Sequence, residues 1–165
     1  MTLDEIYRFV SEEIVATPSA TLSVEECLLG LQLAIDDWHK GHEGRSRYKP
    51  TQLIQGALAG SVLCMTQQGI VRRAIAPLQE RIVSRGKTDI KVVFALLSRE
   101  LEYTDMVESN RRGGARTFTR PAFALYAKTY LQKATDAWVL NGDFAALDEL
   151  RKLAALFVRY LEELN

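Results

Sequence analysis

An arginine-rich segment is the part of this sequence whose residue types are best suited to binding. Residues 108–121 read ESNRRGGARTFTRP, with four arginines around two adjacent glycines. Guanidinium groups bind carboxylates and phosphates through paired hydrogen bonds, and glycines let a backbone turn sharply or approach a ligand. The segment leads into a predicted helix start, whose free amides attract anions. The candidate anion-binding or partner-binding residues here are Arg111, Arg112, Arg116, Thr117 and Arg120.

A second basic segment, GRSRYK at 44–49, precedes another predicted helix and adds the candidates Arg45, Arg47 and Lys49. If both segments lie at one end of the molecule, they form a single basic rim. An ordinary solvated turn also explains the arginine-rich segment, because glycines are common at reversals and Glu108 can pair with Arg111 or Arg112. Three interpretations stay open: a solvated turn, a protein-binding surface, and a phosphate or nucleic-acid site.

Both histidines of the chain fall in DDWHKGHE, at 36–43. Asp36 and His39 share one predicted helix face, and His42 and Glu43 follow at the helix end. Nitrogen and carboxylate ligands at this spacing can hold a transition metal, which would make the chain a metal-dependent enzyme. The alternative is a solvated helix end, where histidine is favoured by the helix dipole.

Catalytic motifs are otherwise missing from the sequence. It has no Walker-type glycine loop, no dinucleotide fingerprint and no helical His-Glu-x-x-His pattern. The Gly-x-Ser of AGSVL lacks the second glycine of a nucleophile elbow, so Ser61 is interpreted as a packing residue. We therefore expect no cofactor, and a binding protein rather than an enzyme.

The elements that carry these residues are predicted to be helices. Apolar residues recur at intervals of three and four along the chain, which indicates one all-α domain over 1–165, a bundle of about six helices. Capping boxes at Thr2 and Ser23, Pro50 and Pro121 in first turns, and Asn141-Gly142 as a stop mark helix ends. Two assignments stay open. The first is whether residues 69–85 form a separate helix. The second is whether residues 90–97 form a helix or a strand, and here we favour helix.

Several residues are assigned to the core. Cys27 and Cys64 are interpreted as two buried, reduced thiols. Gly56 and Gly60, four residues apart, predict close packing of helix backbones. Core packing is likewise the preferred explanation for the aromatic residues on helical stripes, namely Trp38, Tyr126, Tyr130, Trp138 and Tyr160.

The last predicted helix has an apolar face wider than contact with one neighbouring helix requires. It is therefore either central to the fold or part of an interface between chains. The candidate interface residues are Leu147, Leu150, Leu153, Leu156, Phe157, Tyr160 and Leu161.

Charge and hydropathy limit the classes of partner that the chain is expected to bind. The 21 basic and 21 acidic residues cancel, but residues 45–133 carry sixteen basic and six acidic side chains. An electrostatic partner must therefore meet a local patch, and binding to nucleic acid is disfavoured. The charged start MTLDEIYRFVSEE and the lack of a long apolar run predict a cytoplasmic protein without membrane contact. We expect a binding, regulatory or scaffolding protein that self-associates or engages an acidic protein partner.

Overall fold

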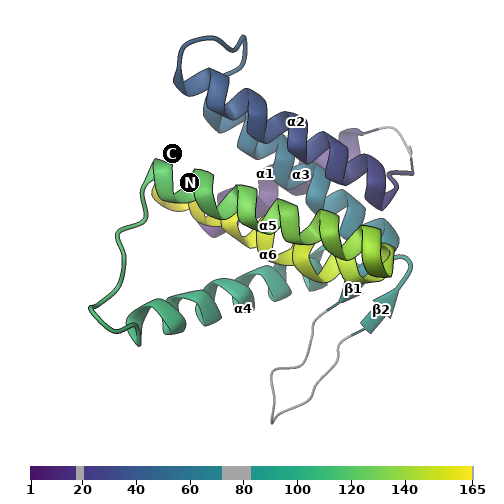
Figure 1. The fold of residues 1–165 in the computed structure, drawn as a ribbon. Helices are drawn as coiled ribbons and strands as arrows, with labels where there is room; N and C mark the ends of the chain where they lie inside the picture. Colours follow the sequence, from purple (N-terminus) through teal and green to yellow (C-terminus); the bar gives the residue numbers. More distant parts are fainter. Residues whose placement is uncertain (18–20, 72–82, 165) are drawn as a thin grey trace.

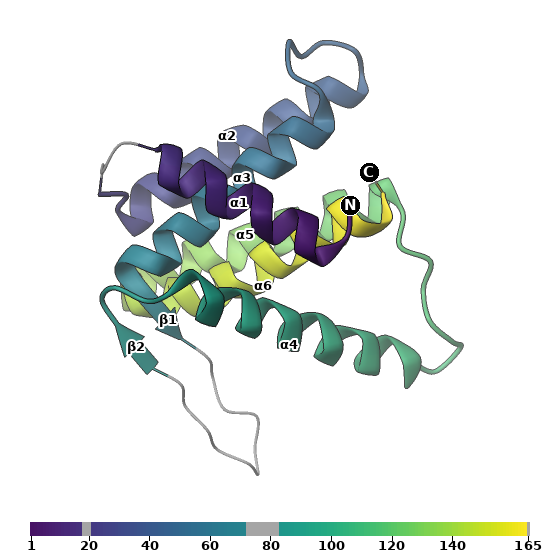
Figure 2. The same ribbon diagram turned by 180° about the vertical axis from the view of Figure 1, so that it is seen from behind.

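The computed structural model describes residues 1–17, 21–71 and 83–164, and these form an all-α helical bundle (Figures 1 and 2). The prediction of about six helices is confirmed. In chain order they are α1 (Leu3–Ala16), α2 (Val24–His42), α3 (Pro50–Gln68), α4 (Ile90–Ser109), α5 (Arg120–Asn141) and α6 (Asp143–Glu163).

Most helix ends follow the predicted signals. Thr2 and Ser23 form capping boxes with Glu5 and Glu26. The Thr119 side chain accepts the Ala122 amide at the start of α5. These caps satisfy amide groups that a helix end leaves without a partner. The last helix, α6, begins without such a cap, because Gly142 takes the N-cap position and makes no side-chain bond.

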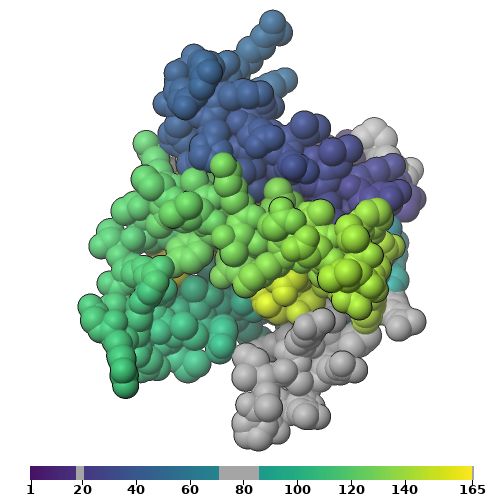
Figure 3. Space-filling view, viewed as in Figure 1, coloured from purple at the N-terminus to yellow at the C-terminus, as the bar shows by residue number. Residues whose placement is uncertain are grey.

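α6 is the central element of the bundle. It packs against α5, α3 and α4, and α1 and α2 also contact it. Almost every residue from Ala146 to Leu161 is buried, and only small yellow areas of α6 are visible beside α5 in Figure 3. A helix with so wide an apolar face must be covered by more than one neighbour, and here the chain's own helices cover it.

The segment at 69–85 differs from the helical expectation. β1 (Gly69–Val71) and β2 (Val83–Arg85) pair as antiparallel strands, with Ile70 opposite Ser84. The middle of the segment for which a helix was considered, residues 72–82, lies outside the described residues. The segment 90–97, in contrast, is helical as we favoured, and it forms the first turns of α4.

The small residues of α3 also differ from the prediction. A Cβ atom added at Gly56 or Gly60 would meet no atom within 4 Å, apart from neighbouring backbone of the same helix. These glycines therefore border an open groove between α2 and α3 and do not hold two backbones together. Cys27 and Cys64 are buried free thiols on the same two helices, as expected.

Candidate functional site

The second half of α4 diverges from α5 and α6. Its first turns are anchored by Val93, Phe94, Leu96 and Leu97, all buried, whereas Tyr103, Met106 and Val107 further along are exposed. Figures 1 and 2 both show α4 and α5 spreading apart toward the loop that joins them. The space between α4, α5 and α6 is a pocket of about 330 Å³, which we call the α4–α6 pocket.

The α4–α6 pocket combines an apolar lining with charged groups. All three helices and the loop at 110–119 contribute side chains to it. The volume lies at the low end of the roughly 300–1,000 Å³ usual for ligand sites, and the mixture of apolar surface with a few polar groups is typical of them. The apolar part consists of Leu101, Val107, Phe118, Ala122, Ala155 and Leu156.

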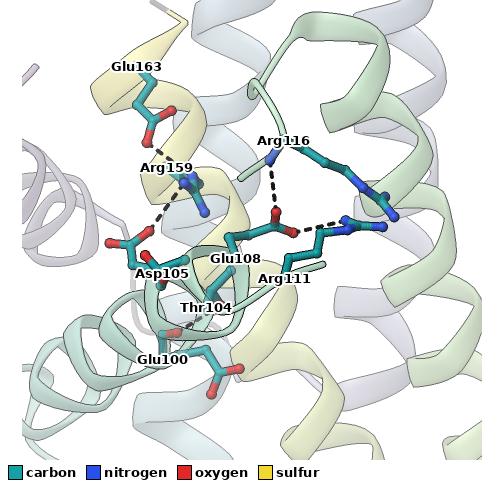
Figure 4. Close-up of polar contacts among 9 residues, drawn as sticks. Glu100, Thr104, Asp105, Glu108, Arg111, Arg116, Arg159 and Glu163 are labelled. Atoms are coloured by element: carbon teal, nitrogen blue, oxygen red, sulfur yellow. Dashed lines mark hydrogen bonds and ion pairs between the residues drawn. The ribbon is translucent and has the colours of Figure 1, made fainter. Parts of the chain in front are cut away.

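Glu108 ties the arginine-rich loop to the end of α4 (Figure 4). Its Oε2 accepts the backbone amide of Arg116 at 3.1 Å, and its Oε1 lies 3.5 Å from Arg111 Nη1. The loop turns through Gly113 and Gly114, whose φ angles of 91° and 87° suit glycine best. The loop therefore has a defined path that places Arg116 beside the pocket.

Arg116 points toward a pair of tyrosines on α5. Its Nη1 donates to Tyr126 Oη at 3.2 Å. The rings of Tyr126 and Tyr130 are nearly parallel, with centroids 6.3 Å apart, and Lys133 Nζ lies 5.9 Å from the centroid of Tyr130. One cationic group thus lies beside each of the two tyrosines.

The environment keeps Tyr130 neutral. Burial raises the pKa of its hydroxyl, and Glu100, Tyr126, Glu149 and Glu108 raise it further. Desolvation and nearby carboxylates both disfavour a phenolate, so the Tyr130 hydroxyl stays protonated.

Most charged groups around the pocket are already paired. Lys152 binds Glu149, and Arg159 binds Asp105 at 3.2 Å and Glu163 at 3.0 Å (Figure 4). The Arg159 guanidinium also lies 5.1 Å from the ring centroid of Phe118.

Arg116 and Lys133 differ from these paired cations, because neither forms an ion pair with a carboxylate in the part of the chain that the structure describes. They are the two cations of the pocket that remain available to an incoming anion.

A buried ion network lies beside the pocket. Arg151 Nη2 bonds Asp148 Oδ1 at 3.1 Å, and Arg151 Nη1 bonds Glu100, which lines the pocket. The side chains of Arg151 and Asp148 are only 5% and 1% exposed. The sequence analysis missed this network, although an oppositely charged pair three residues apart inside an apolar helix is its visible signal.

The arginine-rich loop meets the pocket only in part. Arg116 and Thr117 line it, and Arg111 adjoins it through Glu108. Arg112 is exposed, and Arg120 begins α5.

The basic segment at 44–49 does not reach the α4–α6 pocket. Arg45, Arg47 and Lys49 lie in the α2–α3 connection, which is apart from the loop at 110–119 in both views (Figures 1 and 2). Arg45 pairs there with Glu43. The two basic segments therefore do not form one rim.

The histidine segment does not assemble a metal site. The His42 ring lies 4.1 Å from the Trp38 ring and the His39 ring lies 5.3 Å from it, measured between centroids. Asp36 and Glu43 are exposed. Within residues 1–17, 21–71 and 83–164, no three His, Cys, Asp or Glu side chains are grouped to hold a metal ion.

The candidate interface face of α6 is occupied inside the chain. Of the two predicted roles for this helix, the central one is observed. Each of the seven residues is buried: Leu147, Leu150, Leu153, Leu156, Phe157, Tyr160 and Leu161. Their apolar surface is covered by neighbouring helices and does not form an exposed face.

Another hollow, the groove between α2 and α3, has a volume of about 440 Å³. Its lining includes Gly30, Gly56 and Gly60, and among the described lining residues Glu26 alone is charged. This groove offers little polar chemistry to orient a ligand, so the α4–α6 pocket is the stronger candidate site.

Comparison with known proteins gave no match to a family model and no significant match among curated proteins or solved structures. Across the described residues, no helix is long and apolar enough to cross a membrane.

Proposed function

We propose that this chain is a cytoplasmic binding or regulatory protein, and that the α4–α6 pocket and the loop at 110–119 dock an acidic segment of a partner protein. One observation carries the proposal: Arg116 and Lys133 lack carboxylate partners among the described residues, and each lies beside one of the two tyrosines that line the α4–α6 pocket. Charge complementarity of this kind steers partners and selects among them.

The composition of the surrounding surface supports a protein partner. Tyrosine and arginine are enriched at the energetic centres of protein interfaces. Tyr103, Met106 and Val107 also expose apolar surface on α4. Covering such apolar surface with a partner is favourable, because it removes the surface from water.

The phosphate or nucleic-acid alternative rests on the basic segments at 45–49 and 111–120. It has less support, because the two segments lie apart and Arg45 and Arg111 are each paired with a glutamate. A metal-dependent enzyme using Asp36, His39, His42 and Glu43 has no geometric support among the described residues. Self-association remains part of the proposal, but it must use residues other than the buried face of α6.

Site-specific photo-crosslinking in cells that express the protein tests the proposal. A benzophenone amino acid in place of Tyr103, on the pocket's α4 side, is expected to capture a protein partner. Arg116→Glu combined with Lys133→Glu should abolish the adduct, because both changes put like charge beside an acidic segment.

The matched control is Lys128→Glu, which reverses an exposed charge on α5 outside the pocket lining and should leave the adduct intact. An adduct that survives the double reversal would contradict the proposed docking site. Capture of nucleic acid in place of protein would favour the phosphate alternative.

A further inference from the structure

The groove between α2 and α3, which we call the α2–α3 groove, is a second open surface of the molecule. It lies between two helices that run side by side (Figures 1 and 2), and it shares no lining residue with the α4–α6 pocket. Tyr48 lines the groove and is exposed, and Leu29 and Leu33 on α2 are exposed as well. An exposed apolar patch with a polar border is typical of an interaction site.

The glycines of the groove leave space against both helix backbones. Close packing of α2 on α3 occurs at Gly41, where an added Cβ atom would lie 3.3 Å from Pro50 Cγ. At Gly30, Gly56 and Gly60, in contrast, an added Cβ atom would meet no atom within 4 Å, apart from neighbouring backbone of the same helix. Small residues on a helix surface let another helix approach closely. The space beside these three glycines is therefore available to an element of another chain.

The α2–α3 groove is about as long as two turns of a helix. Its lining extends from Glu26 to Ala34 on α2 and from Gln52 to Gly60 on α3, which is eight positions along each helix. At about 1.5 Å per residue, this length is about 12 Å. An amphipathic helix of two to three turns presents apolar side chains at i, i+4 and i+7 over that distance.

The two flanking helices favour a helical ligand over an extended one. Over the length of the groove, the backbone groups of α2 and α3 are bonded within their own helices, so an extended peptide would find no main-chain partners there. A helix satisfies its own backbone groups and requires only side-chain contacts. Because Glu26 alone is charged among the described lining residues, the groove is best matched by an apolar helix face.

The charged border of the groove is acidic on the α2 side. Glu25, Glu26 and Asp36 are exposed on α2, and none of them forms an ion pair with a cation in the described ranges. Asp37, in contrast, pairs with Lys40. The other wall adds nothing to this charge, because α3 contains no charged residue.

Positive charge lies at one end of the groove only. Arg47 and Lys49 are the chain neighbours of Tyr48, in the connection between α2 and α3. The end at Glu26 therefore keeps an uncompensated negative charge, and a basic group on a ligand complements it. A second copy of α2 would bring acidic side chains of its own to this border, so another copy of the chain is a poorer match.

We propose that the α2–α3 groove docks an amphipathic helix of a partner protein, with its apolar face in the groove and its basic residues facing Glu26. Docking of this kind covers the exposed apolar surface of α2 and brings the partner's backbone close to Gly56 and Gly60. This surface is separate from the α4–α6 pocket, and it takes a basic ligand where the pocket takes an acidic one.

Fluorescence anisotropy with a labelled helical peptide tests the proposal. The probe is Lys-Ala-Leu-Lys-Ala-Ala-Leu-Lys-Lys-Leu-Ala-Lys-Ala-Leu-Lys-Ala, whose leucines share one helix face. Replacing the leucines by alanine, which keeps both charge and helix propensity, should weaken binding at least about ten-fold, because the apolar anchors are lost. Replacing the lysines by glutamate should weaken binding at least about ten-fold, because like charges then meet at Glu26.

Gly56→Leu fills the groove and should weaken probe binding at least about ten-fold. The fold should be retained, because the added Cβ atom has room and leucine forms helices better than glycine. Thermal unfolding checks this directly. Thr129→Leu is the matched control, since it adds the same side chain at an exposed position of α5 outside both hollows, and it should leave probe binding unchanged.

Glu26→Gln tests the charge and should weaken probe binding about two- to five-fold, as for a partly exposed ion pair. Glutamine also fits the capping box that Glu26 forms with Ser23, so the start of α2 is preserved. Arg116→Gln combined with Lys133→Gln should not change probe binding, and this result separates the groove from the α4–α6 pocket.

Three results would overturn the proposal. The first is unchanged probe affinity in Gly56→Leu, which would place the probe elsewhere on the surface. The second is equal affinity for the lysine and glutamate probes, which would remove the role of Glu26. The third is a wild-type molar mass that rises with concentration in light scattering and stays monomeric in Gly56→Leu, which would assign the groove to a second copy of the chain.

Discussion

At the residue scale, the fold shifts the protonation equilibrium of the His42 imidazole. Partial burial lowers its pKa, and the positive charge of Arg120 and the neighbouring His39 lower it further. The ring packs on Trp38, which supplies the apolar contact. The folded chain therefore favours the neutral imidazole.

We expect an NMR titration of His42 to give a midpoint below 6.5, the ordinary histidine value. Arg120→Gln should raise this pKa toward the ordinary value, because it removes a repelling charge. Since the unfolded chain binds the proton more readily, stability should fall as pH decreases through 6.5 toward the folded pKa. Arg112→Gln is the control, and an Arg120→Gln midpoint equal to that of the wild type would refute the assignment of the electrostatic cause.

Residue types alone identified part of the candidate site. Arg116 and Thr117 could be anticipated, because arginine density and turn glycines are local features of the sequence. Tyr126 and Tyr130 were interpreted as core residues, and Lys133 was not singled out. These three became visible as site residues only when the divergence of α4 left one face of α5 partly uncovered, and no local pattern encodes that divergence.

At the element scale, the buried network on α6 determines how α4 is attached. Arg151 joins Asp148 of its own helix to Glu100 of α4, and all three side chains are largely shielded from water. Removing the cation leaves two carboxylates in a poorly solvated place. Breaking a buried pair in this way is far more costly than losing an exposed one.

Arg151→Ala is therefore expected to lower the free energy of unfolding by about 3–5 kcal/mol, measured by urea denaturation. Arg159→Ala is the comparison, since its partners Asp105 and Glu163 are 65% and 45% exposed. That change should cost only about 1 kcal/mol or less for its ion pairs. Equal effects of the two substitutions would show that the Arg151 network is not shielded.

Helices and strands were predictable from the sequence where they are long enough to show a periodic pattern of apolar residues. Twenty-residue helices such as α4 carry enough periodic positions to outweigh the local strand propensity of IKVVFALL. β1 and β2 have three residues each, which is too few to show strand alternation. Their pairing also joins positions that are distant in sequence, and periodicity within a window does not report such contacts.

At the scale of the whole molecule, α6 shows why a wide apolar face was compatible with two hypotheses, a central helix and an interface between chains. A chain of 165 residues can bury such a face inside itself or against another copy, and sequence periodicity is the same in both cases. The position of α6 between α5, α3 and α4 determines the outcome. Helix packing over long sequence separations, not the composition of α6, makes this distinction.

The central position of α6 predicts that its residues act on stability and leave the assembly state unchanged. Leu150 is fully buried, so Leu150→Ala should cost about 2–5 kcal/mol, through lost apolar burial and the cavity left behind. Urea denaturation measures this loss, and light scattering should give the wild-type molar mass below the unfolding transition. Leu140→Ala, at a position 78% exposed, should change stability by no more than about 0.5 kcal/mol. A lower molar mass for Leu150→Ala with unchanged stability would instead place α6 at an interface between copies, because an interface residue controls association without supporting the folded monomer.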